Sequence, residues 1–469
     1  MSAIDGLDRA LDSTKITAFQ SAIIGLCALM AMIDGMDTQA IGLVAPAIAA
    51  DWQVPAAAFG PVFGSSLFCG LIGALVAGQA GDRFGRKPVL IFSILMLTLG
   101  SLATPFTHSI PALLIVRLVT GFGLGGALPI IISITSEFSP KRLRLNIVAL
   151  MYCGFPFGSV LGGVLAAQLI PRFGWASIFY IGGVVPLILL PAFALIMPES
   201  ISFLASNGKR DKVEALSKRL GLQVDGLGVV HSNPQGNPQP RATVRRLFSE
   251  DRALGTLLLW TTLFLSLLLT VFLVSWMPLV THQAGLGIKS AVLGVAALNL
   301  GGIVGCFFIG WISKRFSSIV PIAVAYALGG AAVGLIGLVV QSGQMLLTVA
   351  FVAGILTVGS QMCAVALSAS FYESALRSTG VGWALGLGRI GAVVGPVIGG
   401  ILIAQHVATP TLFLIAGAVS LGAGAAVFGI ARITRRRNPS QFFTTPAIGE
   451  TPGTGLDRQA EPPLQIARS

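Results

Sequence analysis

The chain has 469 residues, a formal net charge of +12, 54% hydrophobic residues and 10% charged residues. A soluble domain carries about 25% charged residues, and the mean hydropathy here is +0.86, so the composition excludes an ordinary soluble protein and indicates a membrane protein. The five cysteines lie in apolar stretches and form no CxxC pair, which predicts neither a disulfide framework nor a zinc site.

A helix needs about 20 mostly apolar residues to cross a bilayer, and the sequence contains twelve such segments. They cover residues 18–48, 56–80, 88–106, 110–136, 145–170, 175–197, 253–281, 290–312, 319–340, 345–371, 378–405 and 410–432. The predicted fold class is therefore an all-α membrane protein with twelve transmembrane helices. The N-terminal residues lack a basic n-region and a small-residue cleavage site, so we expect the first segment to remain as an uncleaved span.

The Lys and Arg residues predict the orientation. Of the 30, two lie inside spans, two lie in loops that face outward if both termini are inside, and the remaining 26 lie on the cytoplasmic side. This distribution follows the positive-inside rule, so both termini are expected in the cytoplasm. The net charge of +12 then reflects membrane topology rather than nucleic-acid binding.

A polar segment, residues 198–252, separates six spans from six and contains the low-complexity run "HSNPQGNPQP". Two stretches of the first half have similar stretches in the second half. The stretch at Gly78 matches the one at Gly310, 232 residues later, and the stretch at Gly162 matches the one at Gly399, 237 residues later, so the two separations are nearly equal. They predict a duplicated six-helix unit with a binding site between the halves. The predicted organisation is a cytoplasmic N-terminus (1–17), an N-terminal bundle (18–197), a central cytoplasmic loop (198–252), a C-terminal bundle (253–432) and a disordered cytoplasmic tail (433–469).

The first span contains "MIDGMDTQA", which places two carboxylates inside an apolar helix. Asp34 and Asp37 are three residues apart and share a helix face, and Gly35 between them is expected to loosen the backbone. Burial and mutual repulsion both favour a proton on one of the two acids, which suits a proton-coupling site. The alternative is that neighbouring donors simply satisfy both carboxylates in a polar pocket.

Two arginines lie inside spans. Arg117 is about 10 Å inside the fourth segment, and Asp34 is about 24 Å along the first, so their depths allow an ion pair or a shared hydrated cavity. A charge at mid-span costs at least ~2.5 kcal/mol to insert. Arg389 lies about 18 Å into the eleventh segment, where its two-pronged guanidinium suits a carboxylate substrate. A structural pairing is the alternative for each arginine.

Aromatic and amide side chains in the spans are further candidates for a substrate cavity, although each alone suits helix packing equally well. They are Trp276 beside Pro278, Tyr152, Phe155, Trp383, Gln361 and Asn299. The sequence "GLGRIG" fits GxGxxG formally, but no strand precedes it and it falls inside a span, which excludes a dinucleotide site.

The connection between the second and third spans reads "GQAGDRFGRKPVL". A loop that only followed the positive-inside rule would need its cations but neither the aspartate nor the glycines, and Asp82 can accept hydrogen bonds from a helix N-terminus or an arginine. The pattern resembles the signature of the major facilitator superfamily, which implies two pseudo-symmetric six-helix bundles and a cytoplasmic latch. The residues expected in gating are Asp82, Arg83, Arg86, Lys87, Glu137, Arg144 and Arg377. In the second half Lys314 stands where the first has Asp82.

Six patterns resemble one branch of that superfamily, the aromatic acid/proton symporters: "DGMD", "RLVTGFGLGGALP", "SEFSPKRLR", "PESISFL", "SWMP" and "GWALGLGRIGAVVGP". The resemblance implies import of benzoate-, hydroxybenzoate- or phenylpropionate-like anions across the inner membrane of a bacterium, driven by the proton gradient. It further implies coupling through Asp34 and Asp37, and a need for Arg117, Arg377 and Arg389 in transport. Ile130 departs from the pattern, because many relatives carry Asn there.

The expected partners are a small aromatic carboxylate, protons and the lipid bilayer. We expect no nucleic acid, cofactor or metal, and a monomeric transporter rather than an enzyme. Proton-antiport efflux of drugs or other organic anions is the alternative, because Asp34 and Arg117 would serve either direction. A membrane receptor would be expected to carry a structured cytoplasmic signalling domain, and the sequence does not indicate one. A membrane enzyme would need a set of catalytic residues or a metal site within the spans, and the sequence indicates neither.

Overall fold

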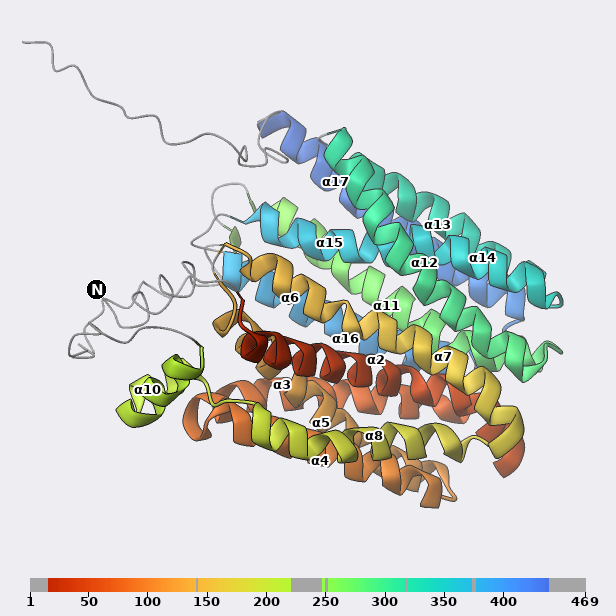
Figure 1. Cartoon of the computed structure of the whole chain (residues 1–469). Coiled ribbons are helices and arrows are strands. Elements are labelled where there is room, and N and C mark those ends of the chain that lie inside the picture. Colours follow the sequence, from red (N-terminus) through yellow and green to blue (C-terminus); the bar gives the residue numbers. More distant parts are fainter. Residues whose placement is uncertain are drawn as a thin grey trace, which may run out of the picture.

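A computed structural model describes residues 16–140, 142–220, 247–248, 252–316, 319–372 and 377–437. Figure 1 shows these residues as a bundle of long helices whose axes run roughly together. Twelve spans in the described ranges are long and apolar enough to cross a membrane, so the predicted all-α fold with twelve transmembrane helices is confirmed.

The N-terminal half contains the first six spans. They are α2 (Ala18–Trp52), α3 (Phe59–Phe84), α4 (Arg86–Ala103), α5 (Ile110–Glu137), the consecutive helices α6 (Arg144–Tyr152) and α7 (Gly154–Phe173), and α8 (Ala176–Ile196). Short 3-10 helices precede α3 and follow α4, η1 (Ala56–Ala58) and η2 (Thr104–Phe106). Several helices extend beyond the predicted apolar windows, because a helix continues into the polar interface after its hydrocarbon-spanning part is complete.

The C-terminal half contains the other six spans. They are α11 (Ala253–Gln283), α12 (Ile288–Arg315), α13 (Val320–Val339), the consecutive helices α14 (Gly343–Leu356) and α15 (Val358–Phe371), α16 (Arg377–Ala404) and α17 (Thr409–Arg437). The predicted central loop is not entirely a loop, since it holds two short helices, α9 (Ile201–Ser206) and α10 (Arg210–Arg219). The run "HSNPQGNPQP" and the tail beyond Arg437 lie outside the described residues.

The two halves touch each other at one end of the bundle. We call the end where α2 begins and α17 finishes the terminal end, and the opposite end the far end (Figure 1). A Cβ at Gly163 of α7 would lie 2.9 Å from that of Ala296 on α12, and a Cβ at Gly42 of α2 would lie 2.9 Å from the carbonyl oxygen of Val274 on α11. Both contacts fall toward the far end, where small residues allow close helix approach.

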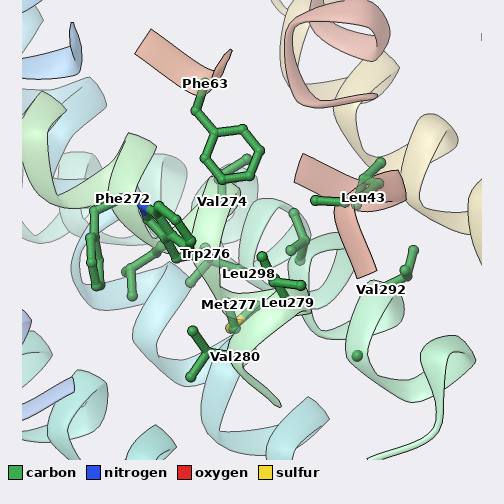
Figure 2. Close-up of a cluster of buried hydrophobic side chains, with 14 of the residues drawn as sticks. Leu43, Phe63, Phe272, Val274, Trp276, Met277, Leu279, Val280, Val292 and Leu298 are labelled. Atoms are coloured by element: carbon green, nitrogen blue, oxygen red, sulfur yellow. The ribbon is translucent and has the colours of Figure 1, made fainter. Parts of the chain in front are cut away.

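A buried apolar cluster fills the same far-end junction. It takes Leu43 and Phe63 from the N-terminal half and Trp276, Met277 and Leu298 from the C-terminal half (Figure 2). The Phe63 and Trp276 rings meet edge to face, with centroids 5.0 Å apart. The halves are therefore packed together at the far end.

Candidate functional site

The two aspartates of α2 are both buried. Asp34 is 5% exposed and Asp37 is 2% exposed. Gly35 between them does not break α2, which is helical throughout Ala18–Trp52. Instead, a side chain at Gly35 would overlap the backbone of Phe155 on α7, and the Ser159 hydroxyl donates a hydrogen bond to the Gly35 carbonyl at 3.1 Å. The expectation of a loosened backbone is wrong, because the missing side chain makes room for the neighbouring helix.

Asp37 belongs to a closed polar cluster inside the N-terminal half. The Ser101 hydroxyl of α4 donates to Asp37 Oδ1 at 2.6 Å, and Arg117 Nη1 of α5 lies 3.5 Å from Asp37 Oδ2. Arg117 Nη2 donates to Thr104 Oγ1 at 2.6 Å, and its guanidinium lies 4.8 Å from the centre of the Phe179 ring. Because residues of α2, η2 and α8 surround it, Arg117 is only 1% exposed.

This arrangement corrects two expectations for Arg117. Its ion-pair partner is Asp37 rather than Asp34, since Asp37 lies about 4.5 Å further along α2 and faces α4, α5 and α8. Direct contact with a substrate between the halves is also absent from the described arrangement, because Asp37, Thr104 and Phe179 enclose the guanidinium within the N-terminal half. Its Nε has no hydrogen-bond partner among the described residues.

Asp34 belongs to a second group, which spans the two halves. The Thr38 hydroxyl donates to Asp34 Oδ1 at 3.1 Å, and Asp34 also interacts electrostatically with Arg389 of α16. The Tyr152 hydroxyl lies in the field of both Asp34 and Arg389. Tyr152 is 41% exposed and Arg389 is half-buried, whereas Asp34 itself is buried, so the Tyr152 and Arg389 side of this group is accessible and the Asp37 cluster is not.

Aromatic rings lie beside this accessible group. Tyr152 stacks on Phe155 with ring centroids 6.1 Å apart and planes 5° apart. On the C-terminal half, Gln361 is half-buried and its amide oxygen accepts a hydrogen bond from Thr270 at 3.0 Å. Trp383 is 47% exposed and stacks on Trp260 with centroids 6.0 Å apart. The stacked Tyr152 and Phe155 thus offer an aromatic surface beside Asp34 and Arg389.

Two predicted substrate-binding side chains are instead part of the far-end junction. Trp276 is fully buried, and its Nε1 donates to the Pro396 carbonyl at 2.9 Å. Asn299 of α12 forms a reciprocal amide pair with Gln39 of α2, with N–O distances of 2.9 and 3.2 Å. In this arrangement neither residue is accessible to a substrate. Trp276 is buried in the junction, and the Asn299 amide is bonded to Gln39 of the other half.

Ile130 does not line the space between the halves. It is 3% exposed in an apolar cluster of the N-terminal half, close to Gly81. The departure from Asn at this position therefore changes packing within one half rather than the polarity of the accessible group.

The predicted gating residues surround a network at the terminal end. Arg86 Nη1 lies 3.0 Å from Glu137 Oε2, and Glu137 Oε1 accepts bonds from the Ser202 amide and hydroxyl, both at 2.6 Å. Glu199 Oε1 accepts from the backbone amides of Arg86 and Lys87 at 2.7 and 3.2 Å. These bonds connect α4, α5 and α9.

The network differs in one respect from the expected latch. Glu199, not Asp82, accepts the hydrogen bonds at the N-terminus of α4, because the carboxylate at the start of "PESISFL" folds back onto the exposed amides. Asp82 and Arg83 are exposed. Arg144 Nη2 donates to the Ser139 carbonyl at 3.5 Å, and the side chain of Arg377 lies outside the described residues.

Sequence reasoning missed the residues that hold Arg117 and α4. Ser101 and Thr104 are three apart at the end of an apolar span, a spacing that puts both hydroxyls on one face and was a usable signal. Phe179 carried no local signal, because its contact with Arg117 depends on how α5 and α8 pack. In the described part of the chain, no three His, Cys, Asp or Glu side chains gather as a metal site would require.

Comparison with known proteins decides the family. A sequence profile of the Major Facilitator Superfamily matches residues 27–340. The chain belongs to this superfamily. Its fold resembles a D-xylose-proton symporter with a TM-score of 0.66 at 15% identity, covering 88% of this chain and 98% of that one. It also resembles a bacterial homolog of the human lysosomal transporter Spinster with a TM-score of 0.66 at 17% identity, covering 92% and 100%. At such identities the likeness shows the fold alone.

Relatives at higher identity confirm the predicted resemblance to the aromatic acid branch. A gallate transporter of Pseudomonas putida is 37% identical over 432 residues, which cover 92% of this chain and 96% of that protein. The 4-hydroxybenzoate transporter PcaK of Pseudomonas aeruginosa is 35% identical over 86% of this chain and 90% of its own length. A 3-(3-hydroxy-phenyl)propionate transporter of Escherichia coli is 35% identical over 86% and 92%. This superfamily member is therefore a multi-pass membrane transporter and not an enzyme.

Proposed function

We propose that this transporter imports aromatic carboxylates of the benzoate, hydroxybenzoate or phenylpropionate type, coupled to protons, by alternating access. The observation that carries the proposal is the group between the halves, where Arg389 of one half interacts electrostatically with Asp34 and Tyr152 of the other. The relatives named as transporters of gallate, 4-hydroxybenzoate and 3-(3-hydroxy-phenyl)propionate support the substrate class.

Arg389 is the proposed anchor for the substrate carboxylate. Its guanidinium is half-buried and therefore partly desolvated, which strengthens a charge-assisted hydrogen bond relative to one in water. The stacked Tyr152 and Phe155 supply an aromatic surface for the ring of the substrate. Gln361 and Thr270 offer hydrogen bonds to ring hydroxyl groups.

Asp34 is the proposed proton carrier, and Asp37 supports it. Asp37 is held by Ser101 and Arg117, so its charge is compensated inside the N-terminal half. Asp34 is buried and interacts electrostatically with Arg389, so its charge and that of an arriving carboxylate would compete for one guanidinium. A proton on Asp34 would leave Arg389 to the substrate, which links proton binding to substrate binding.

Alternating access requires that the far-end junction opens while the terminal end closes. In the described structure the halves meet there through the apolar cluster around Trp276, through small residues and through the reciprocal amide pair of Gln39 with Asn299, and no ion pair between described residues crosses the junction. We place the protein in the inner membrane of a bacterium with both termini in the cytoplasm, in agreement with the distribution of Lys and Arg.

The test is uptake of radiolabelled 4-hydroxybenzoate, gallate and 3-(3-hydroxyphenyl)propionate into proteoliposomes, with and without an imposed proton gradient. The proposal expects accumulation of at least one acid that an inward proton gradient drives and a protonophore abolishes. Gradient-driven extrusion of the same acids would establish the antiport alternative. Failure to move any aromatic acid in either direction would overturn the substrate class.

A further inference from the structure

An open cavity of about 910 Å³ lies at the terminal end of the N-terminal half, away from the site between the halves. The start of α4 forms one wall, and α9 and α10 form the other. Figure 1 shows α10 beside the terminal ends of the first spans. Since α4 is a membrane span that begins at Arg86, the cavity lies where the polar interface of the bilayer meets its hydrocarbon.

Four cations line this cavity. They are Lys87 at the start of α4, Lys209 before α10, and Lys212 and Arg219 on α10. Glu199 also lines it, but its carboxylate already accepts hydrogen bonds from the amides of Arg86, Lys87 and Ser200. Glu214 of α10 pairs with Lys218 at 2.8 Å and does not belong to the lining. The cavity therefore carries an excess of positive charge.

The floor of the cavity is apolar and continues along α4. Ile91, Phe92 and Leu95 line it, and Phe92 and Leu99 are 49% and 56% exposed. These two residues are seven apart, which places them on the same face of the helix. Because α4 is a span, this exposed face borders acyl chains rather than water.

We propose that the cavity binds an anionic phospholipid, with the phosphodiester headgroup among the four cations and the acyl chains along the Phe92–Leu99 face. Basic pockets at the ends of transmembrane helices suit lipid phosphates, because the cations meet a fixed anion at the bilayer surface. A free anion would use the charge but not the apolar floor. The bound lipid joins α10 to α4, directly beside the Glu199 contacts at the start of that helix.

The experiment is native mass spectrometry of the full chain, purified in a mild detergent and incubated with phosphatidylglycerol. Phosphatidylethanolamine with identical acyl chains is the headgroup control. The test variant is Lys209→Gln/Lys212→Gln/Arg219→Gln. The matched control is Lys289→Gln/Lys314→Gln/Arg315→Gln, which removes three cations exposed elsewhere on the bundle.

We expect the wild-type chain to retain phosphatidylglycerol over phosphatidylethanolamine, and the test variant to lose this retention by about tenfold while the control keeps it. Phe92→Gln should also weaken retention, because it makes the floor polar. Equal retention by the test variant and the control would overturn the proposal. Displacement of phosphatidylglycerol by equimolar glycerol phosphate would overturn the lipid assignment in favour of a soluble phosphate. Unchanged elution and thermal stability of the variants show that a loss of retention does not come from global unfolding.

Discussion

The two arginines inside the spans occupy opposite environments. Arg117 is 1% exposed and lies within one half, against Asp37, Thr104 and Phe179. Arg389 is half-buried and interacts electrostatically with Asp34 and Tyr152 of the other half. The Arg117 charge is thus enclosed within the N-terminal half, whereas the Arg389 charge remains available to a ligand between the two halves.

The different environments of Arg117 and Arg389 also favour different roles for Asp37 and Asp34. The Asp37–Arg117 pair can move with its own half as a rigid unit, so a change of conformation does not need to separate it. Asp34 and Arg389 belong to different halves, so any movement of the halves changes their distance. A coupling device must respond to the conformational change, which favours Asp34 and Arg389 for that role.

Arg117→Met is expected to have the largest effect, on stability and transport together. It leaves Asp37 as an uncompensated buried charge, and breaking a buried ion pair costs about 3–5 kcal/mol. The melting temperature of the detergent-purified protein and its folded yield measure this loss. Arg389→Met is the matched variant, and its melting temperature should stay close to that of the wild type because the side chain is accessible.

A double variant tests whether the Arg117 effect comes from the stranded charge. Arg117→Met/Asp37→Leu removes both charges and replaces them with apolar groups of similar size, which is often neutral for stability. Much of the melting temperature should therefore return. If Arg117→Met alone were as stable as the wild type, the closed cluster would have no structural role and the comparison between the arginines would fail.

Asp34→Asn is expected to abolish proton-driven accumulation while the protein stays folded. The amide fills similar space but cannot carry the coupling proton, so exchange of substrate between preloaded vesicles should partly survive. Asp37→Asn should lower the folded yield as well, because it removes the charge that faces Arg117. Asp211→Asn on the exposed start of α10 is the control and should accumulate substrate normally. Wild-type accumulation by Asp34→Asn would disprove the coupling role.

The sequence predicted the spans, the two halves and the polar residues in the spans, because each leaves a local signal. Twenty apolar residues in a row predict a span, and a charge among them identifies a site of interest. It did not predict which aspartate pairs with Arg117, since that depends on the rotation of α2 against α4, α5 and α8. Depth along a helix axis was known, but the direction in which each side chain points was not.

The same limit explains why the sequence did not give the contacts of Trp276, Asn299 and Asp82. A tryptophan beside a proline in a span can line a cavity or fill a junction, and only the contact with Phe63 decides between them. Asn299 was separated by 260 residues from its partner Gln39. Glu199 likewise gave no local signal for its role, because the amides of Arg86 and Lys87 that it binds are 113 and 112 residues away in the sequence.

Arg389→Ala is expected to weaken substrate binding by at least about tenfold, because the lost interaction with the substrate carboxylate is charge-assisted, and to change stability little, because the side chain is only half-buried. Arg389→Lys keeps the charge but loses the two-pronged geometry, so its affinity should lie between those of Ala and wild type. Binding of 4-hydroxybenzoate to the purified protein measures both. The methyl ester should compete poorly with the acid in wild type and lose that disadvantage in Arg389→Ala. An ester that competes as well as the acid in wild type would rule out carboxylate recognition.

The smallest expected effect concerns the junction that separates the accessible site from the far end. Gln39→Leu removes one partner of the Gln39–Asn299 pair and leaves the Asn299 amide without its cross-half bond, at a cost of about 1–3 kcal/mol for the closed far end. The conformational equilibrium should shift severalfold toward an open far end. A cysteine introduced at Ala296, which packs against Gly163 in the closed junction, should then react faster with a membrane-impermeant maleimide added from outside. Gln39→Leu/Asn299→Leu replaces both amides by apolar groups, and its labelling rate should return toward that of the wild type. Equal labelling of the single variant and the wild type would show that the amide pair does not hold the far end closed, and that the apolar cluster around Trp276 does so alone.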